Sequence, residues 1–230
     1  MRNITFENDH YYHIYNRGTD KRKIFDNKGD IWRFIKGILI FNRIKPSGSI
    51  RSKLNQGKIN RDRSAVDYGE LINLSGELVE IIAFCLNPNH FHLLVRQVSD
   101  DGVSKFIQKL SSGYTSFYNT KNKRNGVLFQ GKFKAVQISS DKQLLYTSAY
   151  INVNDKIHDI SEDDKDLVFS SFSEYLGENK VLNICKKDIV LDKFDNKEDY
   201  KEFVEGILEN SKKIKKEKKM DERTDLHLEF

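Results

Sequence analysis

The chain contains two histidines, His90 and His92, that are separated by one phenylalanine and followed by the apolar run Leu93-Leu94-Val95. This run predicts a β-strand, and a strand places alternate side chains on the same face. We therefore expect both imidazoles to point toward one site, while Phe91 faces a hydrophobic core on the other side. The spacing suits metal ligation, although a polar pair on the solvated face of a strand would give the same letters.

Strand and turn signals surround the two histidines. Residues 79–86 are a second run of branched and apolar residues, and Asn87-Pro88-Asn89 between the two runs is typical of a turn. The two runs therefore predict a hairpin. Further strands are predicted at residues 11–16, which are rich in aromatic and branched side chains, and at residues 131–138, which alternate.

Three stretches have the spacing of amphipathic helices. They begin at Asp30, the expected N-cap of the first, at Val103 and at Asp141. The order along the chain is strand, helix, strand, strand, helix, strand, helix. With the strands joined by hairpins and the helices on one face, this order predicts an α+β fold with an antiparallel sheet.

The composition changes along the chain. Residues 46–70 have little apolar content and predict a long loop. Beyond His158 the apolar residues form short groups, which predict small helices packed on the first unit, and the lysine-rich run 212–219 is expected to fray. We predict one domain at residues 1–158, with the long loop, and a small helical C-terminal extension at residues 159–230.

The formal net charge of +5 is unevenly distributed. No Asp or Glu occurs from Gly102 to Ser140, and the absence of carboxylates over this length favours contact with a polyanion. The alternative is that these cations form only a solvated face. Asn16 and Arg17, at the end of the first strand, are further candidates for contact with this polyanion. The basic candidates within the segment are Lys105, Lys109, Lys121, Lys123, Arg124, Lys132 and Lys134.

Targeting and cysteine signals are weak. The sequence has no secretory leader pattern and no run of 18 apolar residues, so neither export nor membrane insertion is indicated, and a cytoplasmic protein is expected. Cys85 and Cys185 lack CxxC spacing, which argues against a disulfide framework and a cysteine-based zinc cluster.

A phenol and a carboxamide, Tyr150 and Asn154, stand four positions apart in the third helical stretch, so they are expected on one helix face. If that face covers the histidine strand, His90, His92 and the Asn154 amide oxygen form a site of two nitrogens and one oxygen. This uncharged donor set leaves positions for a phosphate oxygen and water. It favours Mg²⁺ or Mn²⁺ over a closed structural zinc.

Tyr150 is then the expected nucleophile. A phenol has a pKa of about 10, so it attacks slowly at neutral pH unless a cation or a base favours its ionised form. Attack on a DNA phosphodiester would give a phosphotyrosine and a free 3′-hydroxyl, and attack by another 3′-hydroxyl would later reseal the strand. Tyr114 and Tyr118 are rivals, but they fit the apolar stripe of their helix and are expected in the core or in DNA stacking. His13, in an aromatic strand, is expected to be packed.

Four segments of the chain resemble the single-tyrosine HUH transposases, and among these the REP-associated tyrosine transposases. They are Tyr12-His13-Ile14-Tyr15-Asn16-Arg17-Gly18, the histidine strand 90–95, residues 128–134, and Tyr150-Ile151 followed by Asn154. The resemblance implies a ferredoxin-like antiparallel sheet, Mg²⁺-dependent cutting and joining of single-stranded DNA, and recognition of a DNA hairpin. By position it implies that His90, His92 and Asn154 bind the metal and that Tyr150 is the nucleophile. The family often has Pro after this Asn, whereas this chain has Asp155, which would either assist coordination or mark drift.

Three functions stay open from the sequence. The first is an active nuclease and strand transferase. The second is a domesticated DNA-binding protein, such as a repressor, that keeps the fold without transposition. The third is an unrelated metal-dependent hydrolase, which would need an acidic cluster that is not seen near the histidine strand. The sequence also leaves open the DNA target, and whether the chain acts as a monomer or as a homodimer whose tyrosine serves a partner's histidines.

Overall fold

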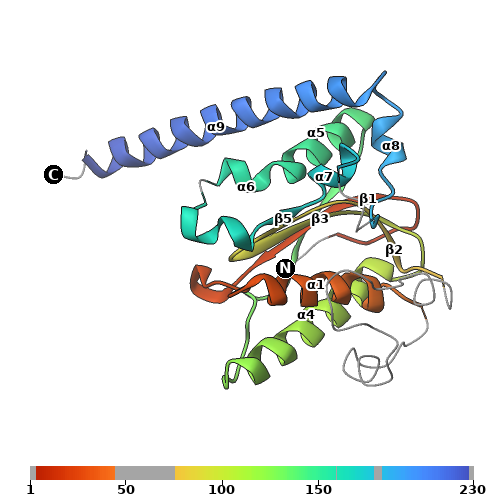
Figure 1. Cartoon of the computed structure of the whole chain (residues 1–230), viewed down its shortest axis with the longest axis vertical. Helices are drawn as coiled ribbons and strands as arrows, with labels where there is room; N and C mark the ends of the chain where they lie inside the picture. The colour runs from red at the N-terminus through yellow and green to blue at the C-terminus, as the bar shows by residue number, and fades with distance from the viewer. Residues whose placement is uncertain (1–3, 45–75, 159, 179–182, 228–230) are drawn as a thin grey trace.

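The structure, a computed structural model, describes residues 4–44, 76–158, 160–178 and 183–227 (Figure 1). The predicted loop at 46–70 lies outside these residues. In the described part of the chain one antiparallel sheet has the strand order β4-β1-β3-β2-β5. The strands are β1 (Tyr11–Arg17), β2 (Val79–Asn87), β3 (His90–Gln97), β4 (Lys134–Ile138) and β5 (Phe169–Ser170).

The first four strands and two helices form a ferredoxin-like unit. The helices are α1 (Lys28–Phe41), between β1 and β2, and α4 (Gly102–Lys121), between β3 and β4. The order β-α-β-β-α-β along the chain, with β1 and β3 central, is that of the ferredoxin-like fold. The predicted α+β class and antiparallel sheet are therefore confirmed.

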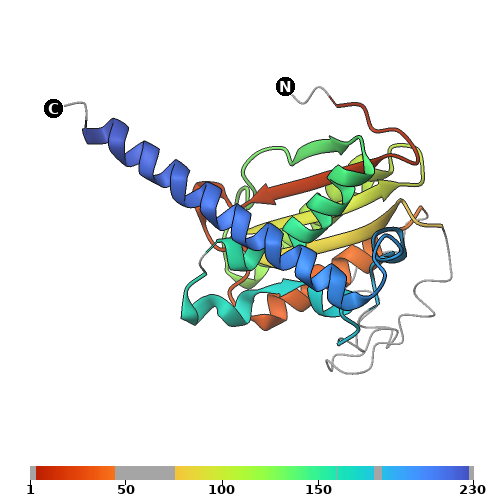
Figure 2. The same cartoon turned by 90° about the horizontal axis from the view of Figure 1, so that it is seen from above.

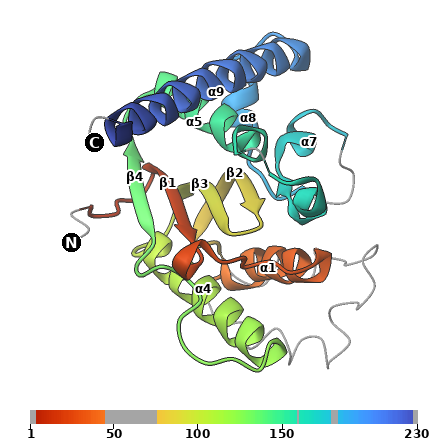
Figure 3. The ribbon, with the colours of Figure 1, turned by 90° about the vertical axis from the view of Figure 1, so that its left-hand side faces the viewer.

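Helices cover both faces of the sheet, so the expectation of helices on one face only is corrected. Figure 3 shows α1 and α4 on one side and the later helices on the other. These later helices are α5 (Asp141–Asn152), α6 (Asn154–Ile157) and α9 (Lys197–His227). The reason lies in the sequences of β2 and β3, which carry apolar side chains on both faces. Both faces of these strands must therefore be covered, and almost all of their residues are buried.

The two faces of β3 carry different side chains. Phe91 points to the α1 side, where its ring centroid lies 5.2 Å from that of Phe34. His92, the next residue, points to the α5 side, where its ring centroid lies 6.2 Å from that of Tyr150. The predicted alternation along this strand is confirmed.

The C-terminal segment is more helical than expected. Short elements, namely η2 (Glu162–Leu167), α7 (Phe172–Tyr175) and α8 (Asp188–Leu191), precede α9, which continues through the lysine-rich run that was expected to fray. Tyr200 and Val204 anchor α9 in the same hydrophobic core as the sheet. Lys and Glu are good helix formers, so the polar part of α9 continues the helix. Figure 2 shows α9 crossing over the sheet and extending past it.

Two helix boundaries differ from the sequence interpretation. The N-cap of α1 is Asn27, whose side chain accepts from the Asp30 N–H, so the helix begins one turn earlier than expected. The third predicted helix is not continuous, because Val153 adopts φ −117° and ψ 18° between α5 and α6. Tyr150 and Asn154 therefore belong to two helices.

No helix among the described residues has both the length and the apolar character that a membrane span needs.

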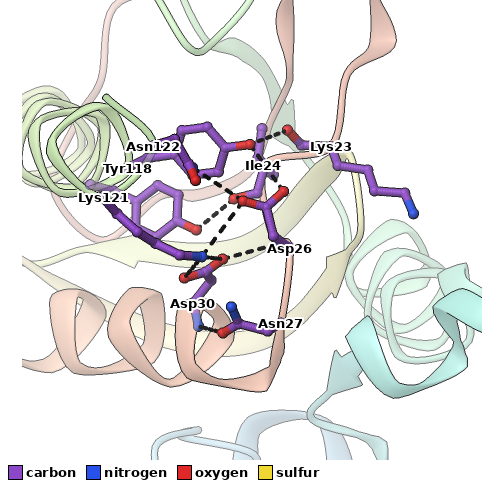
Figure 4. A network of polar contacts seen from close by, with 9 residues as sticks. Lys23, Ile24, Asp26, Asn27, Asp30, Tyr118, Lys121 and Asn122 are labelled. Atoms are coloured by element: carbon purple, nitrogen blue, oxygen red, sulfur yellow. Dashed lines mark hydrogen bonds and ion pairs between the residues drawn. The ribbon is translucent and has the colours of Figure 1, made fainter. Parts of the chain in front are cut away.

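A polar network joins the C-terminal end of α4 to the start of α1 (Figure 4). Asp30 is buried, and its carboxylate accepts from Lys121 Nζ at 2.8 and 2.6 Å and from the Asp26 N–H at 2.9 Å. The Tyr118 hydroxyl and Asn122 Nδ2 donate to the Asp26 carboxylate at 3.1 Å each. The ammonium of Lys121 is thus engaged within the fold.

Replacing Lys121 by Met leaves the buried Asp30 carboxylate without its cation. We expect the free energy of unfolding to fall by about 2 kcal/mol, below the value for a fully buried pair because Lys121 is partly exposed to water. Lys123→Met is the matched control, since Lys123 is exposed, and it should change stability by less than about 0.5 kcal/mol. Urea denaturation followed by circular dichroism measures both, and equal stability of the two variants would contradict the role of the pair.

Candidate active site

Ring side chains from β1 and β3 line the sheet face beneath α5. The register pairs Tyr15 with His92 and Arg17 with His90. The rings of Tyr15 and His92 stack with centroids 5.5 Å apart, and those of His13 and His92 stack at 5.1 Å. The two predicted histidines therefore belong to a layer of ring side chains on this sheet face. We call this layer, formed by His13, Tyr15, His90 and His92, the histidine floor.

The orientation of His90 is fixed by its neighbours. Its Nδ1 lies 2.6 Å from Asn89 Oδ1, and Asn89 Nδ2 donates to the Lys21 carbonyl at 3.2 Å, which sets the Asn89 amide. Because an amide oxygen only accepts, His90 Nδ1 carries the proton and Nε2 presents a lone pair. This Nε2 lies 3.1 Å from Asn154 Oδ1. Two hydrogen-bond acceptors, His90 Nε2 from β3 and Asn154 Oδ1 from the start of α6, therefore lie side by side.

Asn87 holds these two acceptors together. The register of the β2–β3 hairpin places Asn87 opposite His90. Its Nδ2 lies 2.9 Å from His90 Nε2 and 2.8 Å from Asn154 Oδ1, and its side chain is fully buried. Asn154 is also fully buried, and its own Nδ2 has no hydrogen-bond partner among the described residues.

His92 has a histidine partner. Its Nδ1 lies 2.8 Å from His13 Nε2, so one ring donates and the other accepts. If His92 donates, its Nε2 keeps a lone pair, and its arrangement then matches that of His90. The ring centroids of His90 and His92 are 5.2 Å apart.

The imidazoles of the floor are neutral at physiological pH. Burial lowers the pKa of His13 to about 4. Burial, and next the charge of His158, lowers the pKa of His90 to about 4. Burial also lowers the pKa of His92 well below its usual value. A neutral imidazole is the form that binds a metal ion.

Tyr150 faces this floor from α5 of the same chain. Its ring centroid lies 6.2 Å from that of His92 and 6.4 Å from that of His13. Burial raises the pKa of Tyr150, and the side chain of Asn154 acts in the opposite direction because it favours the ionised phenol. One turn earlier in α5, Tyr146 stacks on Tyr150 at 6.4 Å.

A cavity of about 720 Å³ opens over the floor, and its lining is basic. Lys23 pairs with Asp164 at 2.6 Å, and Arg17 donates from Nε to Gln130. Lys134 lies over the Tyr15 ring at 5.9 Å. Side chains from four separate parts of the sequence therefore surround one space. The residues that line it include Tyr15, Arg17, Lys21, Lys23, His90, His92, Lys134, Tyr150 and His158.

A close approach of backbone shapes the basic end of the cavity. A Cβ atom on Gly18 would lie 2.2 Å from the Arg22 carbonyl oxygen, so only glycine fits between β1 and η1 (Thr19–Lys21). The turn carries Arg17 and Lys21 to the cavity wall.

The other predicted DNA contacts are dispersed. Asn16 also lines the cavity, although it is largely buried and its Nδ2 donates to the Gly131 carbonyl at 3.4 Å. Lys121 is paired with Asp30. Lys109 donates to the Arg43 carbonyl at 3.1 Å. The candidates on α4 or just after it lie on the sheet face opposite Tyr150; they are Lys105, Lys109, Lys121, Lys123 and Arg124, while Lys132 is exposed before β4.

The rival tyrosines are remote from the histidines. Tyr114 and Tyr118 lie on α4, where their hydroxyls donate to the Ile24 carbonyl at 2.5 Å and to Asp26. Burial raises the pKa of both, that of Tyr118 to about 12. Both are core side chains, and Tyr118 belongs to the network of Figure 4.

The donor set is suited to a hard divalent cation. No group of three His, Cys, Asp or Glu side chains in the described part of the chain could hold a metal ion, so a cation here would need the Asn154 oxygen. The 3.1 Å separation of His90 Nε2 and Asn154 Oδ1 is close to the roughly 3 Å between adjacent ligands of an octahedral Mg²⁺ with bonds of about 2.1 Å. His90 and Asn154 therefore meet the ligand spacing that such an ion requires.

Several residues of this site were missed or misjudged from the sequence. Asn87 was interpreted only as a turn residue, although the two-residue turn after it predicts its pairing with His90. His13 is packed as expected, but its contact with His92 was missed, and its position two residues before Tyr15 on the same strand face was its only signal. His158 lies 4.9 Å from His90 between ring centroids. No sequence signal linked it to the site.

Asp155 Oδ1 is buried without a hydrogen-bond partner among the described residues, and burial raises the pKa of this carboxyl.

Parts of the chain are similar to known proteins. Residues 72–154 match the sequence model of the family described as "Transposase IS200 like". A solved structure of a REP-associated tyrosine transposase bound to a REP hairpin is similar at 14% identity and a TM-score of 0.49, with coverage of 80% of this chain and 88% of that chain. A search of curated proteins finds no match. The segment that is similar to the IS200-like transposase family, residues 72–154, holds the histidine hairpin and ends at Asn154.

Proposed function

We propose that the chain is a transposase that cleaves and rejoins single-stranded DNA at hairpin-associated sites through a 5′-phosphotyrosine at Tyr150. One observation carries the proposal. A single chain brings the Tyr150 phenol over His92, with ring centroids 6.2 Å apart, in a cavity also lined by His90, whose Nε2 lies 3.1 Å from the buried Asn154 Oδ1. The family match over residues 72–154 supports it.

The cavity lining is suited to a DNA phosphate. Arg17, Lys21 and Lys134 attract a polyanion and position the strand without reading its bases. The partner is single-stranded DNA beside a hairpin, as the sequence resemblance implies. The exposed cations of α4 remain proposed contacts for DNA that continues around the molecule, away from the cavity.

His90, His92 and Asn154 would hold Mg²⁺ or Mn²⁺. Such an ion, when bound, withdraws charge from the scissile phosphate and so lowers the barrier to attack. The neutral state of the two histidines keeps their lone pairs available, because protonated imidazoles do not ligate. Asn89 and His13 orient the two rings from behind.

The chemical step forms a bond from the Tyr150 hydroxyl oxygen to phosphorus and breaks the bond from phosphorus to the 3′-oxygen. The phenol gives up one proton and the departing 3′-oxygen takes up one, so the step needs no net proton. Burial keeps Tyr150 protonated at rest, and the Asn154 side chain favours its ionised form during attack. Rejoining is the reverse step with a different 3′-hydroxyl.

Replacing Tyr150 by Phe removes the nucleophile. With a hairpin oligonucleotide labelled at its 3′ end and Mg²⁺ present, we expect the protein–DNA adduct on a denaturing gel to fall by about a thousandfold or more. Tyr146→Phe is the matched control from the same helix, and it should stay within about threefold of the unmodified chain. Cleavage by Tyr150→Phe would exclude the proposed chemistry, and binding by the unmodified chain without any adduct would favour the domesticated DNA-binding protein.

Replacing His13 by Phe removes the side chain that orients His92. In a Tyr150→Phe background with hairpin DNA bound, we expect Mn²⁺ to bind about 10- to 100-fold more weakly, as measured by electron paramagnetic resonance. His10→Phe, at an exposed histidine near the start of β1, should leave Mn²⁺ affinity unchanged. Equal Mn²⁺ affinity of the His13 and His10 variants would show that His13 does not support the metal ligands.

A further inference from the structure

The end of α5 is tied to the C-terminal segment by a buried polar network. Asn152 is fully buried two residues after Tyr150. Its Nδ2 donates to the Tyr200 hydroxyl of α9 at 2.7 Å, and its Oδ1 accepts from Ser171 Oγ at 2.5 Å. Ser171 in turn accepts from the Phe84 N–H of β2 at 2.9 Å. The Asn152 side chain therefore links the tyrosine helix to both α9 and the sheet.

Tyr200 contacts α5 on one face. Its hydroxyl accepts from Asn152, and the side chain of Ser148, one turn earlier on that face, opposes the rise in pKa that burial gives this hydroxyl. Successive residues of a helix are rotated by about 100°, so Ser148 and Asn152 each lie about 160° from Tyr150 around the axis. A contact that fixes the Ser148 and Asn152 face therefore sets the rotation of α5, and with it the direction in which Tyr150 points.

The tyrosine helix needs such support. It has 12 residues, a length at which a helix alone in water is marginal. It also ends two residues after the nucleophile, because the backbone leaves helical geometry at Val153. Without an anchor the last turn, which carries Tyr150, would be the first to fray.

We propose that Asn152, Ser171 and Tyr200 are positioning residues, through which the C-terminal segment aims Tyr150 at the histidine floor. This inference rests on the proposed function and extends it to Ser171 and Tyr200, which lie outside the segment that matches the transposase family. These residues do not touch the substrate. They hold the phenol in the one orientation that lets it attack, and a misplacement of about 1 Å at such a position can cost a hundredfold in rate.

The chain contains a matched control for this role. Tyr175 of α7 stacks on Tyr200 with ring centroids 5.1 Å apart, and both side chains are fully buried. The Tyr175 hydroxyl, however, donates to the Ile82 carbonyl of β2 at 2.8 Å. Tyr175→Phe and Tyr200→Phe therefore remove the same atom from the same core, and only the second removes a hydrogen bond to the tyrosine helix.

The test compares Tyr200→Phe with Tyr175→Phe in the full chain. The rate of adduct formation is measured at saturating single-stranded hairpin DNA with Mg²⁺, together with the Kd for that DNA and the thermal midpoint. We expect Tyr200→Phe to form the adduct at least tenfold more slowly, with a Kd within about twofold of the unmodified chain. Tyr175→Phe should form it at the unmodified rate, with a similar fall in thermal midpoint.

A second measurement separates positioning from general loss of stability. Hydrogen exchange of the Ile151, Asn152 and Val153 amides should be faster in Tyr200→Phe and unchanged in Tyr175→Phe. Ser171→Ala, which removes the other hydrogen bond to Asn152, should slow adduct formation in the same way and serves if Tyr200→Phe does not fold.

The outcomes are distinct. Equal adduct rates for Tyr200→Phe and Tyr175→Phe would overturn the positioning role, and so would a loss that appears only in Kd. If the unmodified chain forms no adduct at all, the proposed function fails instead. Exchange at the end of α5 would then still report whether the network holds that helix.

Discussion

The arrangement of this molecule depends on the register of the β2–β3 hairpin. The two-residue turn after Asn87 places that carboxamide opposite His90, and both side chains point to the face covered by α5. The break at Val153 then brings Asn154 down to the same point, where its oxygen, His90 Nε2 and Asn87 Nδ2 are in mutual contact. A slip of one residue in the hairpin would turn the side chains of the shifted strand to the opposite face and so separate Asn87 from His90.

Burial gives the site its electrostatic character. The histidine floor is covered by α5 and so remains neutral, whereas cations gather at the open end of the cavity. Neutral donors and a basic rim are the combination expected when the negative charge is brought by the substrate. The far face of the sheet is different, since its basic helix α4 is fixed by the Asp30 and Asp26 network and packs tyrosines into the core.

Much of the fold could be predicted from the sequence, because the strands around His90 and the helices of the first unit have clear periodicity. Their assignment to the α+β class was correct for that reason. The second covered face was missed, since β2 is apolar on both sides and a single strand does not say what covers it. The pairing of His13 with His92, which are 79 positions apart, depends on strand order and could not be inferred locally. The hydrogen bond between Asn152 and Tyr200 could not be predicted for the same reason. The proposed domain boundary near residue 158 also did not indicate that α9 packs on α5.

The central claim is that Tyr150 attacks DNA from above the histidine floor. Tandem mass spectrometry of the trapped adduct, after nuclease trimming and trypsin digestion, tests it most directly. Cleavage after Lys142 and Lys156 gives a peptide that contains both Tyr146 and Tyr150. The account predicts that fragmentation places the nucleotide on Tyr150. A nucleotide on Tyr146, Tyr114 or Tyr118, or on a residue other than tyrosine, would contradict it.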